Sequence, residues 1–88
     1  MILIFFEKFS KILPKGKFFM QFKDMAELGA LIKAERKEQG LTQNDLALAS
    51  NVGIRFIVDI EAGKETAQIG KVLKVCSMLG LKLGVINE

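Results

Sequence analysis

The amino-acid sequence predicts a mainly α-helical domain of four core helices followed by a short C-terminal β-strand. Three observations support this fold class. Leu41 to Gly63 contains two short helical patterns with an N-cap at its start, an asparagine in the middle and a glycine at its end. Apolar residues recur at helical spacing on both sides of this segment, in residues 25–39 and 66–79. Finally, Leu81 to Ile86 alternates between two sides, which is typical of a strand.

The N-terminal arm, residues 1–23, differs in composition from the rest of the chain. It holds six of the seven phenylalanines and the only proline, Pro14. Apolar residues from Ile2 to Leu13 recur at helical spacing, which predicts a short amphipathic helix that ends before Pro14, with extended structure as the alternative. After a turn around Pro14, Phe18 to Phe22 is a candidate strand.

The first helix of the main domain is expected from Met25 to Gln39. Asp24 is a suitable N-cap, because its carboxylate can accept from the free N–H groups of the first turn. Gly40 is a typical C-terminal glycine that closes the helix. Helical spacing places three apolar residues on one stripe, and these are the predicted core positions: Leu28, Leu31 and Ile32.

The second helix begins after Thr42. Its hydroxyl can cap the helix, and Asp45 stands at the third helical position, where a capping box has its acid. Leu46 and Ala47 form the inward face. The pattern breaks at Asn51, a residue that tolerates the left-handed conformation of a sharp turn.

The third helix is expected from Gly53 or Ile54 to Ala62, with Gly63 as its terminator. Ile57 and Ile60 point inward. Two helices of this length, joined by a turn of about 3–4 residues, are the outline of a helix-turn-helix, in which the second helix lies in the DNA major groove.

The outward face of the third helix carries the candidate base-reading residues. Arg55 is the one side chain there that can donate a bidentate pair to guanine, although a phosphate contact or a plain surface charge is the alternative. Ile54 and Val58 can meet thymine methyl groups. Asp59 can accept from cytosine or make a local structural bond, and Phe56 is expected to pack half-buried rather than to intercalate.

The fourth helix is expected to start at Thr66 or Ala67, after a Lys64-Glu65 loop, and to close at Gly80. Cys76 lies on its apolar stripe, which predicts a small core residue and not a redox sensor. Val75 and Met78 lie off that stripe and could belong to a partner surface. The predicted stripe consists of Ile69, Val72, Leu73, Cys76 and Leu79.

The C-terminal strand places Leu81, Leu83 and Val85 on one side. A single strand cannot satisfy its own backbone groups, so it must pair with another strand. Two partners are open: the same strand of a second subunit across a two-fold axis, or Phe18 to Phe22 of its own chain. Both pairings could also combine in one small sheet.

Length and composition exclude several classes of protein. The 88 residues allow one domain with a small core, so dimerisation is expected. With one cysteine and no histidine, neither a disulfide framework nor a Cys/His zinc site can form, and no metal or cofactor is expected. The longest apolar run, Met1 to Phe6, is shorter than the roughly 18–20 residues of a membrane span and lacks the basic start of a signal peptide. A reducing cytoplasm fits this composition.

The net charge of +3 is unevenly distributed. Residues 1–23 carry five lysines and one glutamate, a balance of about +4, whereas the other residues hold eight basic and nine acidic side chains, about −1. The helical domain therefore has no bulk positive field, and any phosphate affinity must come from local placement of charges.

The helix-turn-helix segment resembles the Cro/C1-type (phage-repressor, XRE-like) family over roughly residues 27–79. The residues that carry the resemblance are Arg36, Gly40, Leu41-Thr42-Gln43, Leu46-Ala47, Val52, Ile57 and Ile60-Glu61-Ala62-Gly63. Within that family, GIRFIVDIEAGK followed by KVLKVCSMLGLKL is similar to the HipB-like antitoxins, which are DNA-binding partners of HipA-like kinase toxins.

The resemblance implies a phage-repressor-like helix bundle and assigns roles to several residues. Arg36 is expected to form an ion pair with Glu61, with a solvated Arg36 as the alternative, and Gln43 to touch a phosphate, with simple polar filler as the alternative. Leu81, Leu83 and Val85 are the expected dimerisation residues. The expected DNA-binding residues are Thr42, Gln43, Gly53, Ile54, Arg55, Val58 and Asp59. The family favours Gln, Ser and Thr at the start of its third helix, so Gly53, Ile54 and Phe56 depart from its pattern and weaken any prediction of the operator sequence.

Three segments follow from this interpretation: the arm 1–23, a helix-turn-helix DNA-binding domain 24–80 and a dimerisation strand 81–88. Three interpretations stay open for the arm. It is an upstream translated leader with Met20 or Met25 as the usual start, a packing or dimerisation element, or a basic contact to DNA or a toxin.

The expected function is a homodimeric transcriptional repressor of a palindromic operator, with half-sites about 34 Å apart on double-stranded DNA. The resemblance implies an antitoxin that binds a HipA-like kinase toxin and represses its own operon in a bacterial or phage-infected cytoplasm, at the nucleoid. A stand-alone or phage repressor and a protein-interaction module that retains the fold are the alternatives. No enzyme is expected, because the sequence has no histidine, no GxxxxGK[ST] loop and no catalytic residues.

Overall fold

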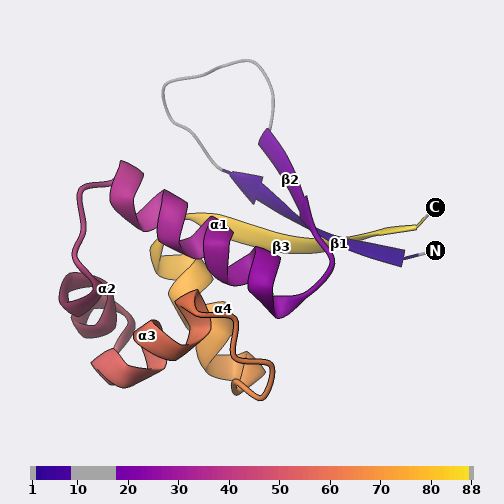
Figure 1. The fold of residues 1–88 in the computed structure, drawn as a ribbon. Helices are drawn as coiled ribbons and strands as arrows, with labels where there is room; N and C mark the ends of the chain where they lie inside the picture. Colours follow the sequence, from indigo (N-terminus) through magenta and orange to yellow (C-terminus); the bar gives the residue numbers. More distant parts are fainter. Residues whose placement is uncertain (1, 9–17, 88) are drawn as a thin grey trace.

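The computed structural model describes residues 2–8 and 18–87 of the chain. Figure 1 shows the helices gathered in a bundle, with a sheet along one side whose strands β1 and β3 extend past the helices toward the two termini. The predicted mainly α-helical fold with a terminal strand is confirmed. In chain order the elements are β1 (Ile2–Lys8), β2 (Phe18–Phe22), α1 (Met25–Glu38), α2 (Gln43–Ser50), α3 (Ile54–Glu61), α4 (Ile69–Met78) and β3 (Leu81–Asn87).

The three strands form one antiparallel sheet in the order β2-β1-β3. Phe18–Phe22 is a strand, as predicted. The predicted amphipathic helix is wrong over Ile2–Lys8, which is the central strand β1, and the extended alternative is correct there. The physical reason is that the apolar run Ile2 to Phe6, rich in isoleucine and phenylalanine, suits a strand with a neighbour on each edge. The remainder of the predicted helix, residues 9–13, lies outside the described residues.

The C-terminal strand β3 pairs with β1 of its own chain, from Lys8 opposite Leu81 to Ile2 opposite Asn87. The expected pairing with Phe18–Phe22 of the same chain is wrong, because β1 lies between β2 and β3. Pairing with the same strand of a second subunit stays a prediction. Within residues 2–8 and 18–87, the other edge of β3 has no strand partner. That edge therefore retains unpaired backbone groups.

The core lies mainly among the four helices, with Phe22 of β2 and Leu81 of β3 on the side of the sheet. Leu28 and Ile32 are buried as predicted, and Leu31 is half-buried beside them. The core also includes the inward residues of the helix-turn-helix and the first residue of β3. The buried hydrophobic residues are Phe22, Leu28, Ile32, Leu46, Ala47, Ile57, Ile60, Val72, Val75, Cys76, Leu79 and Leu81.

The predicted apolar stripe of α4 needs correction at three positions. Val75 is fully buried although it was placed off the stripe, whereas Ile69 is 65% exposed and Leu73 is 46% exposed. The reason is that α4 begins at Ile69 and not at Thr66 or Ala67, so Ile69 occupies the exposed first turn. The buried face is centred between Val72 and Val75, which turns Leu73 outward.

Cys76 packs in the core, as its position on the stripe predicted. Burial raises the pKa of its thiol to about 12. A thiol with so high a pKa holds almost no thiolate near neutral pH, which disfavours nucleophilic reactivity of this cysteine.

Backbone geometry confirms the predicted turn chemistry of the helix-turn-helix. The Thr42 hydroxyl accepts from the Asp45 amide at 2.9 Å, and the Thr42 amide donates back to the Asp45 carboxylate at 2.9 Å. This second bond holds the pKa of Asp45 below its usual value. Asn51 takes the left-handed conformation at φ 57°, and Gly63 ends α3 at φ 89°. The sequence therefore determines where both helices start and stop.

Ser50→Ala is expected to stabilise the protein by about 1 kcal/mol. The Ser50 hydroxyl is buried at the end of α2 and has no hydrogen-bond partner among the described residues. Alanine removes this unsatisfied group and is also a better helix former. Thermal unfolding followed by circular dichroism measures the change. A melting temperature below that of the wild type would show that the hydroxyl has a partner in solution.

Candidate nucleic-acid interface

Helix α3 is held against α1 by a close backbone contact at Gly29. A β-carbon at this position would overlap the carbonyl oxygen of Ile60 and would lie 3.1 Å from the carbonyl oxygen of Glu61. Only a glycine lets the two helices approach so closely without displacement. Nothing in the sequence pattern pointed to Gly29, because its role depends on a tertiary contact.

A buried ion pair fixes the end of α3. Arg36 Nε donates to Glu61 Oε2 at 2.7 Å and Arg36 Nη2 donates to Glu61 Oε1 at 3.1 Å, a bidentate arrangement. The two side chains are 8% and 3% exposed. Arg36 Nη1 also donates to the carbonyl of Leu41 at 2.8 Å, which ties in the turn before α2. The pair implied by the family resemblance is therefore present in the structure.

Gln43 joins the same network from the first turn of α2. Its Nε2 donates to Glu61 Oε1 at 3.1 Å. The amide group that is expected to touch a phosphate is therefore hydrogen-bonded within the protein. Thr42, the N-cap of α2, lies next to it and is exposed. Helix N-termini favour anions, so this corner can receive a phosphate.

The outward face of α3 is exposed, as its spacing predicted. Ile54 is 48% exposed, Val58 is 37% exposed, and the side chain of Arg55 is 85% exposed. Gly53 is the N-cap of α3 and provides no side-chain cap. Helix α3, which carries these residues, lies on the side of the molecule away from the extended ends of β1 and β3 (Figure 1).

Asp59 makes local ion pairs. Its Oδ1 lies 3.2 Å from Arg55 Nε and its Oδ2 lies 3.6 Å from Lys64 Nζ. An exposed pair four residues apart on a helix contributes only about 0.3–0.5 kcal/mol, so Arg55 can exchange Asp59 for another acceptor at small cost. Two roles were expected for Asp59, and the structure favours the local structural bond over the contact to cytosine.

A second cluster, at the start of α4, had not been expected from the sequence. Lys71 Nζ lies 5.7 Å from the centre of the half-buried Phe56 ring, and Lys64 stands across the same concavity of about 220 Å³. Gln68, the N-cap of α4, makes no side-chain cap, which leaves first-turn N–H groups available for an anion. Two lysines that flank a predicted helix start are the signal that could have identified this cluster.

Among residues 2–8 and 18–87, no helix has the length and apolar character of a membrane span. The same residues contain no group of three or more His, Cys, Asp or Glu side chains that could hold a metal ion.

Comparison with known proteins gives matches at the level of family, sequence and fold. Residues 32–86 match the family model HTH_3, described as helix-turn-helix. The chain is 53% identical over 66 residues to "Uncharacterized HTH-type transcriptional regulator y4mF" of Sinorhizobium fredii, covering 75% of this chain and 87% of that protein. It is 33% identical over 64 residues to the "ImmF control region 10 kDa protein" of Bacillus phage phi105, covering 73% of this chain and 71% of that protein.

Among solved structures, the fold is similar to a chain in a HipA-HipB-O2-O3 complex. The TM-score is 0.73 at 20% sequence identity, and the alignment covers 78% of this chain and 97% of that chain. An identity this low supports similarity of fold alone.

Proposed function

This chain belongs to the helix-turn-helix family of XRE-type transcriptional regulators, and on that premise we propose that it is a homodimeric repressor which reads a palindromic operator with one α3 per half-site. The observation that carries the proposal is the contrast between the two faces of α3. Its inner face is locked by Ile57, Ile60 and the Arg36–Glu61 pair, while its outer face is exposed and carries Arg55. A rigid helix with an exposed reading face is what base recognition in the major groove requires.

Each part of the exposed surface has a chemical role in this proposal. Arg55 donates to guanine O6 and N7, and the apolar Ile54 and Val58 contact thymine methyl groups. Thr42 and Gln43 bind a phosphate at the N-terminus of α2, and Gly53 lets the backbone approach the DNA at the start of α3. Lys64 and Lys71 bind a second phosphate at the N-terminus of α4.

Arg55→Ala is expected to weaken specific binding by about 5-fold to 150-fold, which corresponds to about 1–3 kcal/mol for the loss of a bidentate base contact. The measurement is a gel shift at a stated salt concentration with DNA from upstream of the coding sequence. Lys64→Ala is the matched control, because a lost phosphate contact weakens binding to all sequences alike.

The wild-type lane of the same gel decides between DNA binding and its main alternative. The balance of about −1 outside the arm supports a second candidate, a protein-interaction module that retains the fold without binding DNA. A wild-type protein that binds its own upstream DNA no better than random DNA would favour that module over a repressor.

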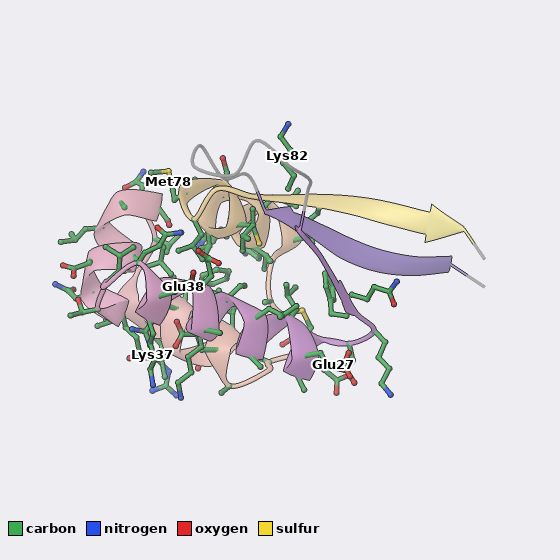
Figure 2. The ribbon with its side chains drawn as sticks, turned by 90° about the horizontal axis from the view of Figure 1, so that it is seen from above. Glu27, Lys37, Glu38, Met78 and Lys82 are labelled. Atoms are coloured by element: carbon green, nitrogen blue, oxygen red, sulfur yellow. The ribbon has the colours of Figure 1, made fainter. Side chains whose placement is uncertain are left out.

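Dimerisation through β3 is part of the proposal. One edge of β3 has no strand partner among the described residues, and its backbone groups can pair with the same edge of a second copy, which would extend the sheet across a two-fold axis. Figure 2 shows Lys82 of β3 pointing away from the helices, so the helical bundle covers the opposite face of the strand and leaves the Lys82 face open.

Removing residues 84–88 is expected to give a monomer. This truncation keeps Leu81, which is 3% exposed and belongs to the core, but it deletes Val85 and the projecting half of the strand. Sedimentation equilibrium of the full chain and of the truncated chain measures the result. A truncated protein that remains a dimer would place the interface elsewhere.

The finer proposal is that the repressor is an antitoxin, bound to a HipA-like kinase toxin in the bacterial cytoplasm at the nucleoid. Its support is the fold shared with a chain of the HipA-HipB-O2-O3 complex and the sequence resemblance of residues 53–83 to HipB-like antitoxins. The relative from a phage control region supports the alternative, a stand-alone repressor. Co-purification of the tagged protein with a kinase encoded beside its gene tests the toxin; a chain that purifies alone points to the stand-alone repressor.

A further inference from the structure

The last turn of α1 reaches the C-terminal ends of two other helices. Arg36 binds Glu61 at the end of α3, as described above. Three residues later, Gln39 Nε2 donates to Glu35 Oε2 at 2.9 Å and to the carbonyl of Leu79 at 2.8 Å. Both hydrogens of one amide group are used, one within α1 and one on α4.

The Leu79 carbonyl lies at a junction between helix and strand. Leu79 is the C-cap of α4, where carbonyl groups lack partners within the helix. Gly80 follows in the left-handed conformation at φ 77°, and Leu81, 3% exposed, is the first residue of β3. A hydrogen bond to Leu79 therefore acts where the chain turns from α4 into β3.

Arg36 and Gln39 extend from the same turn of one helix, one toward α3 and one toward β3. We infer that Gln39 is a positioning residue that fixes the direction of β3 relative to α3. Since β3 is the proposed dimer strand and α3 the proposed reading helix, Gln39 sets the separation of the two half-sites that a dimer reads. This inference rests on the proposed function.

Two substitutions distinguish the effect of the Gln39 hydrogen bonds from the effects of side-chain size and helix propensity. Gln39→Met keeps an unbranched side chain with good helix propensity and loses both donors. Gln39→Lys has the same propensity class and a terminal ammonium that can donate to both the Glu35 carboxylate and the Leu79 carbonyl. Lysine is therefore expected to rescue what methionine loses.

The DNA measurement is the ratio of affinities for two operators, which a general loss of stability would not change. Wild-type protein first selects a palindromic operator from random-sequence DNA. Affinity is then measured for that operator and for a version with one base pair inserted between the half-sites. Gln39→Met is expected to lower the preference for native spacing about fivefold, the factor for one hydrogen bond of about 1 kcal/mol. Gln39→Lys is expected to keep the preference, and all three proteins should bind an isolated half-site equally.

A DNA-free measurement distinguishes failure of this inference from failure of the proposed function. Amide hydrogen exchange in Gln39→Met is expected to be about fivefold faster for Leu81 to Leu83, with α3 unchanged, because the released Leu79 carbonyl loosens the start of β3. Wild-type exchange rates at Leu81 to Leu83 in Gln39→Met would overturn the inference. If exchange quickens but the wild type selects no operator, the positioning of β3 stands and the repressor proposal fails. If exchange quickens and the spacing preference is unchanged, the link to half-site separation is wrong.

Discussion

Gly29→Ala is expected to destabilise the protein by about 3 kcal/mol, near the upper end for an overpacked contact. The new β-carbon would overlap the Ile60 carbonyl oxygen and press on the backbone of Glu61. Alanine is the better helix former by about 1 kcal/mol, but that gain is the smaller effect because a backbone group cannot rotate away as a side chain can. Thermal unfolding should show a melting temperature lower by more than about 10 °C.

Gly70→Ala is the matched control for this prediction. Gly70 lies in α4, and a β-carbon there meets nothing within 4 Å. Its replacement should leave stability unchanged or raise it by up to about 1 kcal/mol, since only helix propensity changes. Equal melting temperatures for the two variants would mean that α1 and α3 can separate without loss, and that the close contact does not hold α3 in place.

Features that the sequence predicted well are local ones. The capping box at Thr42 and Asp45, the left-handed Asn51 and the terminal Gly63 each depend on a few neighbouring residues, and the structure has all of them. Helix-turn-helix boundaries were therefore predictable. The exposed face of α3 followed from the same boundaries by helical spacing.

Features that the sequence did not predict depend on distant residues. The run Ile2 to Phe6 fits helical and extended patterns, and only its two neighbouring strands select the strand. Val75 is buried and Leu73 is exposed because packing against α2 and β3 decides which side of α4 is covered. Gly29 and Gln39 matter through contacts with residues 31 and 40 positions away, and no spacing rule detects such contacts.

Arg36→Ala is expected to destabilise the protein by about 3–5 kcal/mol, the largest single effect of the variants proposed. The Glu61 carboxylate, 3% exposed, would lose both guanidinium donors and keep only the amide of Gln43. The Leu41 carbonyl would lose its donor as well. Urea unfolding measures the change in the free energy of unfolding. If the urea midpoint of this variant equals that of the wild type, water replaces the arginine without loss of stability.

The double variant Arg36→Met, Glu61→Leu separates the cost of an unpaired charge from the value of the pair. Removing both charges avoids a buried carboxylate, so the double variant should be more stable than Arg36→Ala, although the Leu41 carbonyl lacks its donor in both variants. It also removes the acceptor that holds the Gln43 amide at the start of α2. If Gln43 positions a phosphate as proposed, the double variant should fold well and yet bind the operator less tightly than the wild type. If a stable double variant binds the operator as tightly as the wild type does, the ion pair has a structural role alone. In that case Gln43 does not need Glu61 to hold it in position.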